Sequence, residues 1–286
     1  MMNNTTVVGV DMGATTIRSA RIHEGQIVEQ STISVSAQAD KETVLRELIE
    51  AIERVCHSDS AGIGIGVPSV VDQAQGIVYD VENIPSWKEV PLRHILEQRF
   101  QIPVSINNDA NCFALGEACF GKGQAYRHLV GVTLGTGIGV GIVINRQLYS
   151  GVSCGAGELG ILPYVDHDYE YYCSGQFFPN EYQVSGEDLF ILASQGDQKA
   201  KEIFEQYGQH LGNAFWMIVA AYDPELIVLG GSISKAYPFF KHAIWDRLAA
   251  FPFRPTIKRL VIEVTDTPEI ALLGAAALCS DRLNAR

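Results

Sequence analysis

The sequence lacks the features that place a protein in a membrane or in an oxidising compartment. No apolar run is long enough to span a bilayer, and the apolar stretch after the polar N-terminus stops at Asp11, too early for the core of a signal peptide. The six cysteines include no Cys-x-x-Cys pair, which suits free thiols better than a disulfide framework. We therefore expect a cytoplasmic protein that does not associate with membranes.

Positive charge is also scarce. The chain has 21 lysines and arginines against 33 aspartates and glutamates, so its formal net charge is −12. Such a surface repels the phosphates of nucleic acid, and we expect no nucleic-acid partner. The acidic run at 166–170 copies the first positions of a calcium loop, but Tyr171 and Phe177 occupy the places where glycine and glutamate are needed.

What the sequence does contain is two halves with a similar order of strands and helices. In the first half we expect a hairpin, a helix capped by Asp40, a strand, a short helix and a strand, at about 7–34, 41–55, 61–67, 92–100 and 104–109. In the second half we expect strands, helices, a strand, and a final strand and helix, at about 129–148, 186–222, 226–229 and 259–281.

This repetition predicts an α/β architecture of two duplicated halves with a central cleft. The smaller N-terminal domain is expected at 1–115, and the C-terminal helix at 270–286 could cross back to complete it. The larger domain is expected at 116–269.

Two turns of small residues follow buried-looking strands and could grip a polyphosphate from two sides. Missing side chains let backbone N–H groups approach phosphate oxygens closely. The second turn has neither the Rossmann nor the P-loop spacing. Close packing of a sheet against a helix, a turn-capping Asp11 and a plain turn at Gly230 remain the structural alternatives. The candidate nucleotide-binding residues are Asp11, Gly13, Ala14, Thr15, Thr16, Gly135, Thr136, Gly137, Gly230 and Gly231.

Carboxylates and amides form a second set of candidates. Asp109 stands between Asn108 and Asn111, an arrangement suited to accepting a proton from a hydroxyl that the amides orient. An Asx turn that caps the following helix is the alternative. Glu158, in a glycine-rich loop, and Glu181 could accept hydrogen bonds from the hydroxyls of a polyol, or could simply be exposed charges.

Six segments in this order resemble the ROK family of bacterial sugar kinases and sugar-responsive repressors, within the actin-like ATPase and sugar kinase superfamily of duplicated ribonuclease-H-like domains. The resemblance covers residues 7–279. The matching segments are DMGAT at 11–15, NIPSW at 83–87, NDAN at 108–111, LGTGIG at 134–139, GELG at 157–160 and LGGS at 229–232.

The resemblance implies ATP-dependent phosphorylation of a hexose at its 6-hydroxyl, with Asp109 as the general base. It implies that the glycine turns hold ATP with Mg²⁺, and that relatives are commonly homodimers. Glucose ranks first as substrate and N-acetylated hexosamines close behind, and a non-catalytic sugar sensor is the alternative. A DNA-binding repressor is not expected. The residues implied to hold the other sugar hydroxyls are Asn83, Asn108, Asn111, Glu158 and Glu181.

One departure from the family concerns zinc. Most members carry a zinc site made by one histidine and three cysteines, and the corresponding positions here are Ile161, Tyr172, Ser174 and Pro179. These side chains cannot form a tetrahedral zinc centre, so we expect no structural zinc. Aromatic packing is expected to hold the segment at 162–180, and Ile161 also removes a sugar contact that the family histidine makes.

Overall fold

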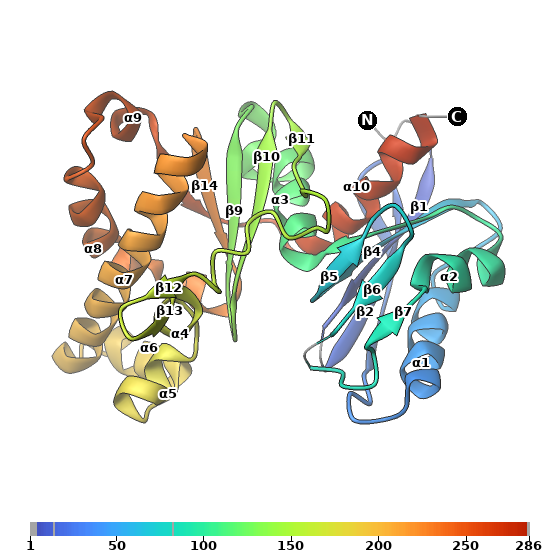
Figure 1. Cartoon of the computed structure of the whole chain (residues 1–286), viewed down its shortest axis with the longest axis horizontal. Coiled ribbons are helices and arrows are strands. Elements are labelled where there is room, and N and C mark those ends of the chain that lie inside the picture. Colours follow the sequence, from blue (N-terminus) through green and yellow to red (C-terminus); the bar gives the residue numbers. More distant parts are fainter. Residues whose placement is uncertain (1–4, 14, 82, 285–286) are drawn as a thin grey trace.

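The computed structural model describes residues 5–13, 15–81 and 83–284, and its backbone forms two five-stranded sheets flanked by helices (Figure 1). In the first sheet three consecutive antiparallel strands are extended by two parallel strands. Its strands, in spatial order, are β3 (Gln26–Ser34), β2 (Thr16–His23), β1 (Thr6–Met12), β4 (Ser60–Val67) and β8 (Val104–Asn108).

The second sheet repeats this plan. A hairpin of β9 and β10 is extended on one side by parallel strands, as the first sheet is. The duplicated α/β fold predicted from the sequence is therefore confirmed. The spatial order is β11 (Gln147–Leu148), β10 (Ile138–Ile144), β9 (Leu129–Leu134), β14 (Leu226–Gly230) and β15 (Val261–Val264).

Helices predicted at 41–55, 92–100, 186–222 and 270–286 are found there, whereas the helices at 237–249 and 254–259 were not predicted. Helix α1 (Lys41–Glu53) begins where Asp40 accepts a hydrogen bond from the Thr43 N–H at 2.7 Å, and α2 (Leu92–Phe100) lies where predicted. None of the described helices combines the length and apolar character needed to cross a membrane. The others are α3 (Asp109–Phe120), α6 (Gly186–Ser194), α7 (Gln198–Tyr222), α8 (Tyr237–Ala249), α9 (Arg254–Arg259) and α10 (Ile270–Asn284).

Shorter elements complete the fold. A three-stranded sheet extends the first half beside β8, and the segment at 162–180, expected as a loop, folds into a small hairpin and two short helices. The three-stranded sheet contains β5 (Val70–Asp72), β6 (Ile77–Tyr79) and β7 (Glu89–Val90). The segment contains β12 (Pro163–Tyr164), β13 (His167–Asp168), α4 (Tyr169–Cys173) and α5 (Phe177–Tyr182), and two 3₁₀ turns lie at Lys122–Ala125 and Ser232–Ala236.

The C-terminal helix α10 returns to the first half of the chain, where it packs against β1, β4 and α3 (Figure 1). The approach is close enough to require glycine. A Cβ atom added to Gly64 of β4 would lie 1.8 Å from the Ala275 carbonyl oxygen, and one added to Gly274 would lie 1.7 Å from the Cys112 carbonyl oxygen. A core of apolar residues from both halves fills this junction. The domain limits at 115 and 269 stay a prediction.

Candidate active site

The predicted base, Asp109, is the first residue of α3 rather than the last of β8. The strand ends one residue earlier because the Asn108 side chain caps the helix, accepting hydrogen bonds from the Ala110 and Asn111 N–H groups at 2.9 and 3.3 Å. The capping alternative for Asn108 is thus confirmed. Asp109 lies at the carboxyl end of a parallel strand, where α/β proteins bind ligands, and next to the positive end of a helix dipole.

The environment of Asp109 suits a general base. Its side chain is half-buried, and this burial raises its pKa to about 7, assisted by the negative charges of Asp11 and Glu158 and opposed by the Ala110 N–H. A carboxyl group with a pKa near neutrality accepts a proton more readily than an ordinary carboxylate does. Asp11 and Glu158 are far from Asp109 in sequence, but the fold brings their carboxylates close enough to raise its pKa.

We expect this pKa to appear in the pH dependence of turnover. If Asp109 acts as a base, kcat/KM falls about tenfold per pH unit below about pH 7, because the protonated form cannot accept the hydroxyl proton. Replacing Asp11 by asparagine removes one negative neighbour and moves this acidic limb to lower pH. Initial rates between pH 5 and 9 check both, and a flat profile would contradict the role given to Asp109.

The first glycine turn joins β1 to β2 and is closed by a hydrogen bond from the Gly13 N–H to the Thr16 carbonyl oxygen at 2.9 Å. Thr15 and Thr16 are exposed beside it, and Ala14 lies outside the described residues. The turn therefore has two exposed threonine side chains beside its backbone, and their hydroxyls are open to solvent.

Arg18 is a member of this site that sequence reasoning missed. It pairs with Asp11 in the β1–β2 register, and its guanidinium contacts the Asp11 carboxylate and, at 2.9 Å, that of Glu269 at the start of α10. The hairpin register, which places residue 18 opposite residue 11, was the signal that could have found it. Arg18 therefore links the Asp11 carboxylate to the start of α10.

The second glycine turn, between β9 and β10, is supported from behind by Glu170. One Glu170 carboxylate oxygen accepts a hydrogen bond from the Ile138 N–H at 3.2 Å, and a Cβ atom added to Gly137 would lie 2.5 Å from the same oxygen. No atom lies within 4 Å of a Cβ added to Gly135, so that residue faces open space. The sequence analysis assigned no role to Glu170, because the calcium-loop pattern at 166–170 fails, and its support of the turn appears only in the fold.

A cavity of about 630 Å³ opens beside this turn. Gly231, at φ +81°, directly precedes Ser232, which lines the cavity, and a Cβ atom added to Gly231 would lie 2.2 Å from the Leu134 carbonyl oxygen. Polar groups and aromatic rings line the cavity, a combination that suits a nucleoside. Its lining includes Gly135, Thr136, Gly175, Gln176, Phe178, Glu187, Phe190, Phe204, Ser232 and Lys235. The residues at 176, 187, 190, 204 and 235 belong to no motif, so no sequence signal marked them.

The predicted sugar-binding residues have different surroundings. Asn83 is exposed in the turn before Trp87, and Glu181 is exposed on α5, where it accepts a hydrogen bond from the Tyr171 hydroxyl at 2.8 Å. Glu158 is open to solvent, although the protein atoms around its carboxyl and the charge of Glu170 raise its pKa. Asn111 is buried.

Aromatic rings pack together in the segment that the family resemblance aligns with a zinc site. Tyr172 stacks on His210 at 4.7 Å between ring centroids, and the burial of His210 lowers its pKa. Tyr164 stacks on Tyr169 at 4.3 Å, and the rings of Phe177 and Phe178 continue the cluster towards α7. Of the four zinc positions, Tyr172 and Ser174 are buried, Pro179 is exposed, and Ile161 is 74% exposed.

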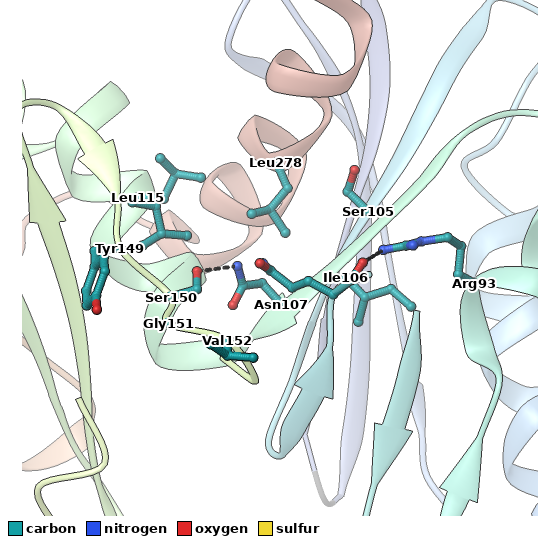
Figure 2. A pocket seen from close by; sticks show the side chains of 12 residues that line it. Arg93, Ser105, Ile106, Asn107, Leu115, Tyr149, Ser150, Gly151, Val152 and Leu278 are labelled. Carbon is teal, nitrogen blue, oxygen red and sulfur yellow. Dashed lines mark hydrogen bonds between the residues drawn. The ribbon is translucent and has the colours of Figure 1, made fainter. Parts of the chain in front are cut away.

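A second cavity, of about 580 Å³, lies between the halves and contains none of the predicted sugar- or nucleotide-binding residues (Figure 2). Ser105 and Asn107 of β8 line it from the first half, and residues 149–152 line it from the second. Leu115 of α3 and Leu278 of α10 form its apolar wall.

Comparison with known proteins identifies the family of this chain. The ROK family model matches residues 7–282. This chain belongs to the ROK family. The ROK chain is 29% identical to the glucokinase of Thermotoga maritima, an alignment that covers 97% of this chain and 98% of the glucokinase.

Other relatives of this ROK chain include a solved kinase and a regulator. A ROK family glucokinase from Streptomyces griseus, in complex with glucose and AMPPNP, superposes with a TM-score of 0.82 at 26% identity over 96% of this chain and 98% of that one. The xylose repressor of Bacillus spizizenii is 29% identical over 85% of this chain and 68% of the repressor. The relatives therefore support sugar kinase activity, with a regulatory branch beside it.

Proposed function

We propose that this protein transfers the γ-phosphoryl group of ATP to the 6-hydroxyl of a hexose. The observation that carries the proposal is Asp109, a half-buried carboxyl with a pKa near 7 at the carboxyl end of β8. The hydroxyl oxygen bonds to the γ-phosphorus, the bond from that phosphorus to the oxygen of ADP breaks, and Asp109 takes the hydroxyl proton. Positioning and neutralisation of charge supply most of the rate in such a transfer.

The nucleotide is assigned to the two glycine turns and the 630 Å³ cavity beside them. The Thr136 N–H and the exposed hydroxyls of Thr15 and Thr16 are proposed to face the phosphates, and the base and ribose are proposed to occupy the cavity next to Gly231. Asp11, held by Arg18, is the carboxylate proposed to bind hydrated Mg²⁺. When bound, the ion neutralises phosphate charge as the transfer proceeds.

The sugar is assigned to the space in front of Asp109. Asn83, Asn108, Asn111, Glu158 and Glu181 are proposed to hold its remaining hydroxyls. The exposed apolar side chain of Ile161 offers no hydrogen bond near the anomeric carbon but could accept the methyl group of an N-acetyl substituent. Glucose is the first substrate to test, followed by N-acetylmannosamine and N-acetylglucosamine.

The deciding experiment measures ADP release from Mg-ATP across a panel of hexoses and N-acetylhexosamines. A rate that depends on one sugar supports the kinase and names its substrate. Similarity to a xylose repressor favours the second candidate, a sugar sensor without catalysis. Sugar binding by calorimetry with no ADP release from any sugar would support the sensor and contradict the kinase.

We further propose that the protein is free of structural zinc and that the aromatic cluster replaces it. Metal analysis of the purified protein is expected to find less than about 0.1 zinc per chain. The Tyr172→Ala variant is expected to lose about 3 kcal/mol of unfolding free energy, because the side chain is only 8% exposed and stacks on His210. Tyr149→Ala, at a tyrosine that is 53% exposed, is the control. One tightly bound zinc per chain would contradict the proposal.

The family resemblance supports an oligomer, and the scattered cysteines suit a reducing compartment. We propose a cytoplasmic homodimer. Sedimentation velocity at micromolar concentration checks the dimer, which a single species at the monomer mass would contradict.

A further inference from the structure

Asn107, the residue two positions before the proposed base, has no role in the function as argued so far. Its side chain is 1% exposed, and both its oxygen and its nitrogen make hydrogen bonds. The oxygen Oδ1 accepts hydrogen bonds from the Asn108 N–H at 2.8 Å and from Asn111 Nδ2 at 2.9 Å. The nitrogen Nδ2 donates to Ser150 Oγ at 3.0 Å (Figure 2). One amide therefore contacts two of the predicted sugar-binding residues and a serine from the other half of the chain.

Ser150 begins the segment that leads from the second sheet to Glu158. This segment contacts the first half of the chain at three further points. Asn111 Nδ2 donates to the Cys154 carbonyl oxygen at 3.3 Å, the Val71 N–H donates to the Ser153 carbonyl oxygen at 3.3 Å, and the Cys154 side chain packs in the core of the first half. The Asn107 amide is thus a buried link between two segments. One is residues 107–111, which contain Asp109 (the Asp109 segment), and the other is residues 150–158, which end at Glu158 (the Glu158 segment).

We propose that Asn107 is a positioning residue, which holds the Asp109 segment and the Glu158 segment in register across the junction of the two halves. This inference rests on the proposed kinase function. Hydrogen bonds between buried groups are directional and strong in a low dielectric, so they fix relative position better than apolar contact does. A displacement of about 1 Å at a reacting group can lower a rate about a hundredfold.

A double-mutant cycle tests the proposal. Asn107→Ala is expected to lower kcat about a hundredfold and Ser150→Ala about tenfold, with a smaller change in the KM for ATP. The double variant is expected to be no slower than Asn107→Ala alone, since both changes break the same connection. Ser19→Ala is the matched control, because it removes an equally buried hydroxyl bond, to the Ala51 carbonyl oxygen at 2.6 Å, on the first sheet. It is expected to lower stability with kcat unchanged.

A conservative variant separates positioning from simple structural support. In Asn107→Asp the carboxylate keeps both acceptor contacts, and the Ser150 hydroxyl can donate to it, so the connection survives. The added negative charge lies two residues from Asp109 and raises its pKa. We therefore expect kcat at high pH to recover to within about threefold of wild type, with the acidic limb moved to higher pH.

Hydrogen exchange at the Asn108 amide provides a second readout that needs no turnover. Faster exchange in Ser150→Ala than in Ser19→Ala supports the proposal even if the protein proves not to be a kinase. Lower melting temperatures with wild-type kcat and unchanged Asn108 exchange would overturn it, as would rate effects that add in the double variant. Absence of ADP release by the wild type would contradict the proposed function instead.

Discussion

Replacing Asp109 by asparagine is expected to lower kcat about a thousandfold while leaving sugar affinity within a few-fold of wild type. Asparagine has the same shape and can still hydrogen-bond the sugar, but it cannot take the hydroxyl proton during transfer. General-base catalysis contributes roughly 10² to 10⁴ in rate. Steady-state ADP release gives kcat, and calorimetric titration with the sugar gives the affinity.

The stability of this variant gives an independent check on the pKa. In the folded protein the Asp109 pKa is about 7, above the value of about 3.9 of an unfolded aspartate. Below about pH 4 both states are protonated and the residue has no effect on stability. As pH rises towards 7 the unfolded chain ionises first, so the wild type loses stability that the asparagine variant keeps. The variant is therefore expected to be more stable than wild type at pH 8.

Asp223→Asn is the matched control for both measurements. It removes the same charge at an exposed helix end, at φ +43°, a conformation that asparagine also tolerates. We expect wild-type turnover and little change in stability. An Asp109→Asn protein that kept more than a tenth of wild-type kcat would contradict the assignment of the base.

The second large effect is expected at Gly64, where a side chain has no room. In Gly64→Ala the new methyl group would lie 1.8 Å from the Ala275 carbonyl oxygen, which belongs to the backbone of α10 and cannot rotate away. Either α10 or β4 must shift, and we expect a loss of about 3 kcal/mol in unfolding free energy. Because α10 also packs on α3, which begins at Asp109, kcat is expected to fall as well.

Gly62→Ala is the control, two residues earlier on the same face of the same strand. There the added Cβ would meet the Cys279 sulfur and the Pro103 carbonyl oxygen at 3.4 Å, which the site tolerates with little adjustment. Alanine also restricts the unfolded chain, so its net effect is expected to be within about 1 kcal/mol of wild type. Urea unfolding of both variants makes the comparison. Equal midpoints would show that α10 does not pack on β4 as closely as described.

Local sequence patterns were sufficient to predict the structure wherever it depends on residues that are close in sequence. Asp40 could be assigned as a cap because it bonds an N–H three residues away, and the apolar period that follows it describes one face of α1. The strand end at residue 108 was placed within one residue. The error there arose because the Asn108 side chain, and not the hydrophobic pattern, determines where α3 begins.

Contacts between distant segments could not be predicted in this way. Glu170 supports a glycine turn more than thirty residues earlier, and Asn107 meets Ser150 from the other half of the chain. Nothing in the sequence around Gln176 or Lys235 indicates that both line one cavity. These contacts depend on how the two sheets and their helices pack in space. The spacing of apolar residues along the sequence does not encode that packing.

The sequence by itself determined the duplicated α/β plan, the glycine turns and the carboxylate between two amides, because strand periods, turns and caps depend on residues a few positions apart. The tertiary structure alone decided the pKa of Asp109, the pairing of Arg18 with both Asp11 and Glu269, and the connection through Asn107. Charge interactions and desolvation depend on distance in space, and only the packing of the two halves brings these groups within reach of one another.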